Sequence, residues 1–279
     1  MTGPTPEAIL VLALAVGLAL LLRWMLGPRR PRAVAEVPAG WRERLYAEVP
    51  QASLVPAQLR AQYERLVERF LQEKRFVGCN ALAVDDRMRI AVAGLACLLI
   101  LRPAPSRNPP LFPQVKSVLL YPDRFYVRHE EPDELGLVSD EAVEQLGESW
   151  EGDRVVLSWA DIEAALAGDE VNVVAHEFAH QLDDENPATE GAPLLGDYTR
   201  WSEVMTREFE RLQRQRRPPV LDPYGAESPG EFFGVVTEAF FQRGAELRRH
   251  HAELYALLRE YYRLDPAEQV LWPNAAAGR

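Results

Sequence analysis

The sequence has 279 residues, of which 47% are hydrophobic, so it can form one large globular domain or two small ones around a substantial core. Its formal net charge of -11 at pH 7 argues against a nucleic-acid-binding protein, because neutralising phosphates requires a surplus of Lys and Arg. The two cysteines, Cys79 and Cys97, lie in apolar segments without a CxxC partner. This spacing argues against both a disulfide framework and a zinc ribbon.

The N-terminal segment differs sharply from the rest of the chain. Residues 8–22 form an unbroken apolar run, and the stretch 9–26 is just long enough to cross a bilayer as a helix. A basic cluster follows at residues 29–32, and positive residues stay on the cytoplasmic side. A cleaved signal peptide is the alternative, but it would carry positive charge before the run, where residues 1–7 offer only the terminal amine. We therefore predict a single-pass anchor in the inner membrane, with the rest of the chain facing the cytoplasm.

The rest of the chain divides into segments of different composition. We expect residues 1–32 to form the anchor and its basic flank, 33–50 a linker, 51–265 a globular domain and 266–279 a C-terminal tail. Within the domain, apolar spacing predicts helices and two strand regions. The helices are expected over 56–74, 90–101, 161–166, 170–183, 198–214, 231–243 and 252–263, and the strands over 117–127 and 154–159. The prediction is a mostly helical α+β domain with a small sheet, preceded by one transmembrane helix.

The residues that carry chemistry form the pentapeptide HEFAH, which contains His176, Glu177 and His180. Residues four apart lie on one face of a helix, so both imidazoles can bind one metal ion. Glu177 lies beside them, where a carboxylate can take a proton from a metal-activated water. Apolar residues project to the opposite face, which argues against the alternative of a helix with two merely exposed histidines. The motif predicts a zinc peptidase with one Zn2+ per chain.

A catalytic zinc site needs a third protein ligand and one open position. The residues after His180 do not supply the third histidine of an HExxHxxGxxH pattern, so a downstream carboxylate is expected. Glu231, in the first turn of a helix that begins near Pro229, is our candidate. Glu238, on nearly the same face, is either the alternative ligand or a supporting residue. Asp183 shares the ligand face of the HEFAH helix and either holds a histidine N–H or is a solvated residue at the helix end.

These residues also resemble a known family. The segment HEFAHQLD, preceded by VVLSW and NVV and followed by a Tyr-(x)6-Glu-Phe-Phe pattern, resembles the Mlc titration factor A peptidases over about residues 50–265. The C-terminal part is also similar to the catalytic domain of anthrax lethal factor, a gluzincin-type metalloprotease. The resemblance implies a gluzincin-like domain in which His176, His180 and Glu231 bind zinc and Glu177 is the general base. It further implies that the hydroxyl of Tyr224 stabilises the oxyanion.

Two classes of function compete with the enzyme. The family resemblance implies a transcriptional repressor as a possible partner besides a peptide or protein substrate, so the chain could act by capturing that repressor. A pure binding module has no need of Glu177, however, and the complete motif favours an enzyme. A structural zinc domain is the other alternative, but such sites are normally closed, cysteine-rich shells of four ligands. Neither cysteine lies near the motif.

Overall fold

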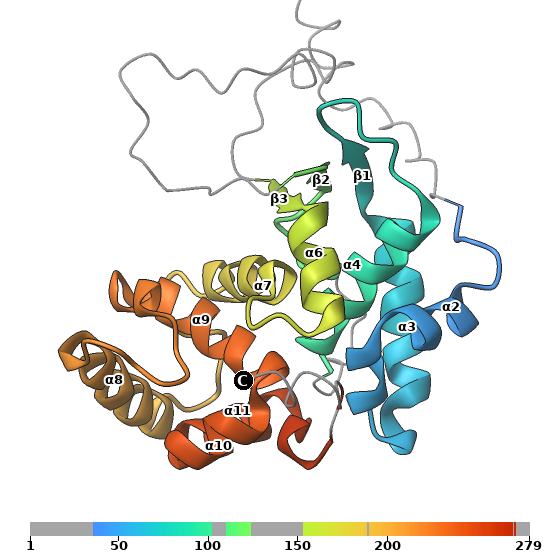
Figure 1. Cartoon of the computed structure of the whole chain (residues 1–279). Coiled ribbons are helices and arrows are strands. Elements are labelled where there is room, and N and C mark those ends of the chain that lie inside the picture. Colours follow the sequence, from blue (N-terminus) through green and yellow to red (C-terminus); the bar gives the residue numbers. More distant parts are fainter. Residues whose placement is uncertain (1–35, 102–109, 124–152, 189, 270, 272–279) are drawn as a thin grey trace, which may run out of the picture. The chain divides into compact units, whose positions relative to one another are not determined.

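The computed structural model describes residues 36–101, 110–123, 153–188, 190–269 and 271. Within these ranges the chain is mostly helical with one small sheet, which confirms the predicted α+β class (Figure 1). The described α-helices are α2 (Trp41–Glu48), α3 (Ala57–Glu73), α4 (Asp86–Leu98), α6 (Trp159–Ala167), α7 (Val173–Asp184), α8 (Thr199–Arg214), α9 (Pro229–Gln242), α10 (Gly244–His250) and α11 (Ala252–Tyr262). Short 3-10 turns are η1 (Pro50–Leu54), η2 (Pro223–Ala226) and η3 (Pro266–Glu268).

The sheet has three parallel strands in the order β1 (Arg75–Gly78), β2 (Ser117–Tyr121) and β3 (Arg154–Ser158). In the register, Leu119 of β2 pairs with Val77 of β1 and with Val156 of β3. Parallel neighbours need a crossover connection, and α4 lies between β1 and β2 in the chain. Helix α6 follows β3 directly because Ser158 caps it by accepting the N–H of Asp161.

One continuous apolar core runs from Trp41 in α2 to Leu264 after α11. Helix α7, which carries the HEFAH motif, contributes the fully buried ring of Phe178 to this core. That ring packs edge-on against Phe70 of α3, with centroids 5.5 Å apart, and against Phe112, with centroids 4.7 Å apart. The described structure therefore places one face of α7 in the core, as the sequence predicts.

The ends of the domain are more structured than we expected. Residues 41–48, which we assigned to a linker over 33–50, form α2, and its side chains Trp41 and Leu45 are buried in the core. Beyond residue 265, Pro266 in η3 is buried and lies against Gly244 at the start of α10. Strand β1 and helix α10 are further elements that the sequence pattern did not indicate.

The predicted membrane localisation is corrected by the structure. Across the described ranges, no helix combines the length and the apolar composition needed to cross a bilayer. Helix α4 is nearly all buried but has only 13 residues, or about 20 Å of rise against a hydrocarbon core of about 30 Å. The longer α3 and α8 are amphipathic, with one polar face. The apolar run over 9–26, on which the single-pass inner-membrane assignment depended, lies outside the described residues.

Candidate metal centre

Two helices, α7 and α9, bring the predicted metal ligands together. Helix α7 begins at Asn172, whose side chain accepts the N–H of Ala175 at 3.1 Å. It presents His176 and His180 one turn apart, with ring centroids 4.7 Å from each other. Helix α9 begins at Ser228, whose Oγ accepts the N–H of Glu231 at 3.1 Å. These two caps fix the start of each helix and so the faces that carry the ligands.

His176, His180 and Glu231 form a group of metal-binding type. One ligand atom from each lies within 4.8 Å of the others. Oε2 of Glu231 is 3.0 Å from Nε2 of His176 and 3.6 Å from Nε2 of His180. Nε2 of His180 is buried and, among the described residues, has no hydrogen-bond partner. Two imidazole nitrogens and a carboxylate oxygen aimed at one point are a donor set that fits a divalent metal such as zinc.

Glu238 connects the metal-binding face to the start of α7. Its Oε1 lies 2.6 Å from Nδ1 of His176, and its Oε2 accepts the backbone N–H of Asn172 at 2.7 Å. Only 9% of Glu238 is exposed. A carboxylate that holds one ring nitrogen of a histidine fixes the ring and directs the other nitrogen toward the metal. Of the two roles open to Glu238, this geometry corresponds to the supporting one.

The carboxylates make the site strongly attractive to positive charge. Burial lowers the pKa of His176, but hydrogen bonds with Glu231 and Glu238, together with the charge of Glu177, outweigh burial and raise this pKa to about 10. Burial raises the pKa of Glu231, but the hydrogen bond from His176 and the nearby ring of His180 lower it far below its usual range. The same two carboxylates that favour a proton on His176 favour a bound cation.

Gly234 allows the close approach of α9 to the ring of His176. A Cβ at this position would lie 2.7 Å from Cε1, 2.8 Å from Nδ1 and 2.9 Å from Nε2 of that ring. Glu231, Gly234 and Glu238 are spaced three and four residues apart, so they share one face of α9. A residue with a side chain at this position would push the ring away from the two carboxylates.

Glu177 and Tyr224 lie at the same centre. Glu177 is partly buried on α7, and its charge raises the pKa of both His176 and Tyr224. Tyr224 lies in η2, and its ring centroid is 6.2 Å from that of His176. Burial, the charge of Glu231 and a hydrogen bond to Glu231 together raise the pKa of Tyr224, so its hydroxyl stays protonated.

Asp183 has a different role from the one we expected. Its two carboxylate oxygens accept the backbone N–H groups of Gly191 and Ala192, at 2.9 and 2.8 Å. Gly191 has a positive φ of 76°, and a Cβ there would lie 2.5 Å from the carbonyl oxygen of Pro229. Asp183 therefore holds the segment after α7 against the start of α9, while Glu238 binds the histidine.

Gly234 was not among the site residues predicted from the sequence, although a signal for it is present. The spacing Glu-(x)2-Gly-(x)3-Glu over residues 231–238 places a residue without a side chain between two carboxylates on one helical face. Such a spacing opposite an HExxH helix indicates close packing of the two helices at the metal centre.

Two histidines one turn apart on one helix, faced by a glutamate on a second helix, are the arrangement expected at the metal site of a metallopeptidase. A family model described as glucose-regulated metallo-peptidase M90 matches residues 26–263, and the chain belongs to this family. The match confirms the resemblance to the Mlc titration factor A peptidases that the motifs indicated.

Relatives of this chain match most of its length. An uncharacterized protein of Synechocystis sp. is 39% identical over 239 residues, which cover 82% of this chain and 86% of that protein. Mlc titration factor A of Salmonella schwarzengrund is 30% identical over 246 residues, or 85% of this chain and 90% of the relative. Mlc titration factor A of Escherichia coli K12 is 28% identical over 242 residues, or 84% and 89%.

Proposed function

We propose that this chain is a zinc-dependent peptidase of gluzincin type, with His176, His180 and Glu231 as the metal ligands. The observation that carries the proposal is the convergence of their three ligand atoms within 4.8 Å. The carboxylate of Glu238 behind His176 supports it, because metal-bound histidines are commonly held in this way. Membership of a metallopeptidase family agrees with this assignment.

The remaining site residues fit peptide hydrolysis. A zinc ion held by these ligands would polarise the peptide carbonyl and lower the pKa of water toward neutrality. Glu177 then accepts the proton of the attacking water and delivers it to the leaving amine. Tyr224, whose hydroxyl remains protonated, donates a hydrogen bond to the oxyanion that develops on the carbonyl. Glu238 keeps Nε2 of His176 directed toward the ligand cluster throughout.

The role of Glu177 can be tested by a change that preserves its shape. In Glu177→Gln, zinc content should stay at one ion per chain, while peptide cleavage should fall by about 100-fold or more because the base is lost. Metal analysis and peptide cleavage by the purified full chain, with and without a chelator, measure both. Glu203→Gln, at an exposed position on α8, is the control. Normal cleavage by Glu177→Gln would show that another group is the base.

The two glutamates of α9 should respond differently to the same change. Glu231→Gln removes a proposed ligand, so stoichiometric zinc should be lost on dialysis. Glu238→Gln removes only the charge behind His176, and zinc affinity should fall by about 10- to 100-fold while excess zinc still fills the site. Competition with a chelating dye measures both affinities. If Glu238→Gln empties the site and Glu231→Gln does not, the ligand assignment is reversed.

Capture of a protein partner is a second activity to test. Two relatives carry the name Mlc titration factor A, which describes them by what they titrate. For this chain we propose a transcriptional repressor of that kind as the partner to test. Capture is not favoured as the main function, because binding alone does not require Glu177. A Glu177→Gln variant that retained the full cellular effect of the chain would reverse this preference.

A further inference from the structure

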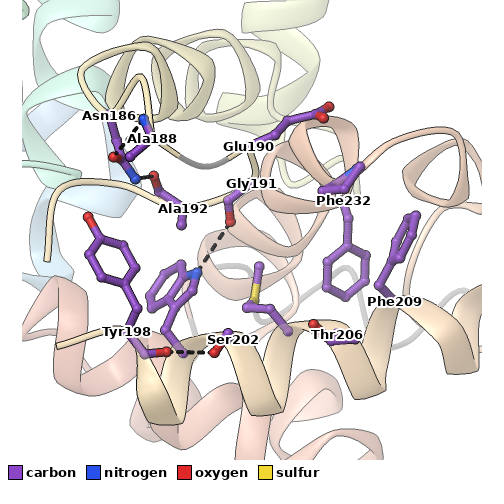
Figure 2. A pocket seen from close by; sticks show the side chains of 13 residues that line it. Asn186, Ala188, Glu190, Gly191, Ala192, Tyr198, Ser202, Thr206, Phe209 and Phe232 are labelled. Atoms are coloured by element: carbon purple, nitrogen blue, oxygen red, sulfur yellow. Dashed lines mark hydrogen bonds between the residues drawn. The ribbon is translucent and has the colours of Figure 1, made fainter.

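A cavity of about 410 Å³ lies between α8, the first turn of α9 and residues 186, 188 and 190–192, which follow α7. Figure 2 shows that its walls come from all three segments, with Tyr198, Ser202, Thr206 and Phe209 along one side and Phe232 at one end. Its volume is within the usual range for sites that hold a small ligand or a large side chain.

The cavity is distinct from the metal centre. Pro229 and Phe232 line it and are three residues apart, so they share a face of α9. Glu231 and Gly234 are on another face of α9, which lies against His176 of α7. The first turn of α9 therefore separates the two sites. None of the proposed metal ligands, all of which the structure describes, lines the cavity.

The interior of the cavity is apolar, aromatic and held in place. Trp201, Met205 and Phe232 line it and are 4%, 6% and 1% exposed. Nε1 of Trp201 donates to the carbonyl oxygen of Gly191 at 3.2 Å, which satisfies the indole and fixes its ring. Phe209 packs edge-on against Phe232, with centroids 5.6 Å apart. Rigid aromatic walls of this kind favour a flat or bulky apolar group.

The rim of the cavity carries a negative charge. Glu190 lines it and is exposed to solvent, and its Oε1 accepts the N–H of Gly230 at 3.4 Å. The whole chain has a formal net charge of -11, so the surrounding field also favours cationic ligands. A group that binds here should combine an apolar part with a nearby positive charge.

We propose that this cavity binds a peptide segment in which a large apolar side chain, such as Phe, lies next to Lys or Arg in the sequence. The apolar side chain fills the space beside Trp201 and Met205, and the cation lies next to Glu190. This binding goes beyond the proposed hydrolysis and does not require the metal centre. The first turn of α9 then lies between the bound polypeptide and the carboxylate of Glu231, the proposed metal ligand.

The peptide side of the proposal can be tested on the full chain after metal removal with a chelator, and again on zinc-loaded Glu177→Gln. The probe is acetyl-Gly-Phe-Lys-Gly-amide, and binding is measured by calorimetry. Replacing its Phe by Ala should weaken binding by about tenfold or more, because one aromatic side chain leaves its apolar site. Replacing its Lys by Glu should weaken binding by roughly two- to five-fold, and less at high salt. Equal binding of the Phe and Ala peptides would overturn the proposal.

Variants of the protein test the same proposal, and they change exposed positions so that folding is preserved. Thr206→Trp should fill the cavity and weaken binding of the probe by about tenfold or more, whereas Glu203→Trp, on the same helix but outside the cavity, should not. Glu190→Gln should remove the preference for Lys over Glu in the probe. Unchanged binding by Thr206→Trp, or no saturable binding at millimolar probe, would overturn the proposal. Probe binding is measured on protein that cannot cleave, either metal-free or Glu177→Gln. The proposed hydrolysis is tested separately, by zinc content and peptide cleavage.

Discussion

His176 is the most constrained side chain of the metal centre. Its Nδ1 is 2.6 Å from Glu238, its Nε2 is 3.0 Å from Glu231, and Gly234 lies against its ring. All three neighbours belong to α9, whereas His180 comes from the same helix as His176. Metal affinity should therefore depend on the packing of α9 as strongly as on the HEFAH helix itself.

Adding one methyl group at Gly234 tests this dependence. In Gly234→Ala, the new Cβ would lie under 3 Å from three atoms of the His176 ring, so the ring must move away from both carboxylates. A misplaced ligand should lower zinc affinity by about 10- to 100-fold, measured by competition with a chelating dye. Gly196→Ala is the matched control, because a Cβ there would meet nothing within 4 Å. Wild-type zinc affinity in Gly234→Ala would contradict the close packing.

Residue roles within one helix were easier to predict than roles that depend on packing. The spacing of His176 and His180 predicted two candidate ligands on one face, because one turn of helix fixes their separation. The sequence left Glu238 open between a ligand and a supporting residue, since the face of α9 that meets α7 is decided by tertiary contacts. For the same reason, it could not show that Asp183 holds the segment at Gly191 instead of a histidine.

At the scale of elements, the position of α7 depends on the segment over residues 111–115. Lys74, at the end of α3, is only 4% exposed, and its Nζ donates to the carbonyl oxygens of Leu111, Phe112 and Val115. This contact holds the ring of Phe112 against Phe178 on the core face of α7. A buried ammonium thus satisfies three carbonyl groups and orders the support of the metal-binding helix.

Removing this ammonium should lower the free energy of unfolding far more than removing Lys116, the other lysine of the chain. Lys74→Met leaves buried carbonyl groups unsatisfied and should lower the free energy of unfolding by about 2–4 kcal/mol. Lys116 is 41% exposed and pairs with Asp153 at 2.8 Å, so Lys116→Met should cost less than about 1 kcal/mol. Urea unfolding of the two variants measures the difference. Similar losses for both would mean that the Lys74 contacts contribute little.

Local patterns predicted the long elements better than the short ones. The helices over 57–73 and 199–214 each have a strong apolar face, and both were predicted nearly to their ends. Helix α2 has almost no amphipathic pattern, and β1 and α10 have only 4 and 7 residues. The parallel strand order could not be predicted, because it joins residues far apart in the sequence and depends on the crossover through α4.

At the scale of the whole described domain, the C-terminal helices are tied to α8 by a buried hydrogen bond between a histidine and a carboxylate. Nδ1 of His251, between α10 and α11, lies 2.7 Å from Oε2 of Glu208 on α8. The two residues are 2% and 6% exposed. Arg211 also contacts this carboxylate, at 3.3 Å, and donates to the backbone carbonyl of His250 at 3.1 Å. The cluster connects α8, which lines the cavity, with α10 and α11, which pack against α9.

The charge of Glu208 should make this connection depend on pH in a defined direction. Burial raises the pKa of Glu208, but the hydrogen bond from His251 and the charges of His251 and Arg211 lower it below the ordinary value of 4.5. Between these two pKa values the unfolded chain binds more protons than the folded one. Glu208 therefore stabilises the fold fully above pH 4.5 and progressively less as the pH falls through its folded pKa.

At neutral pH, Glu208→Gln should lower the free energy of unfolding by about 2 kcal/mol. This difference in stability from wild type should shrink below pH 4.5. Glu210→Gln, at an exposed position two residues away, should show a small gap with little pH dependence. Urea midpoints from neutral to acid pH measure both variants, and a gap for Glu208→Gln that widened on acidification would contradict this assignment.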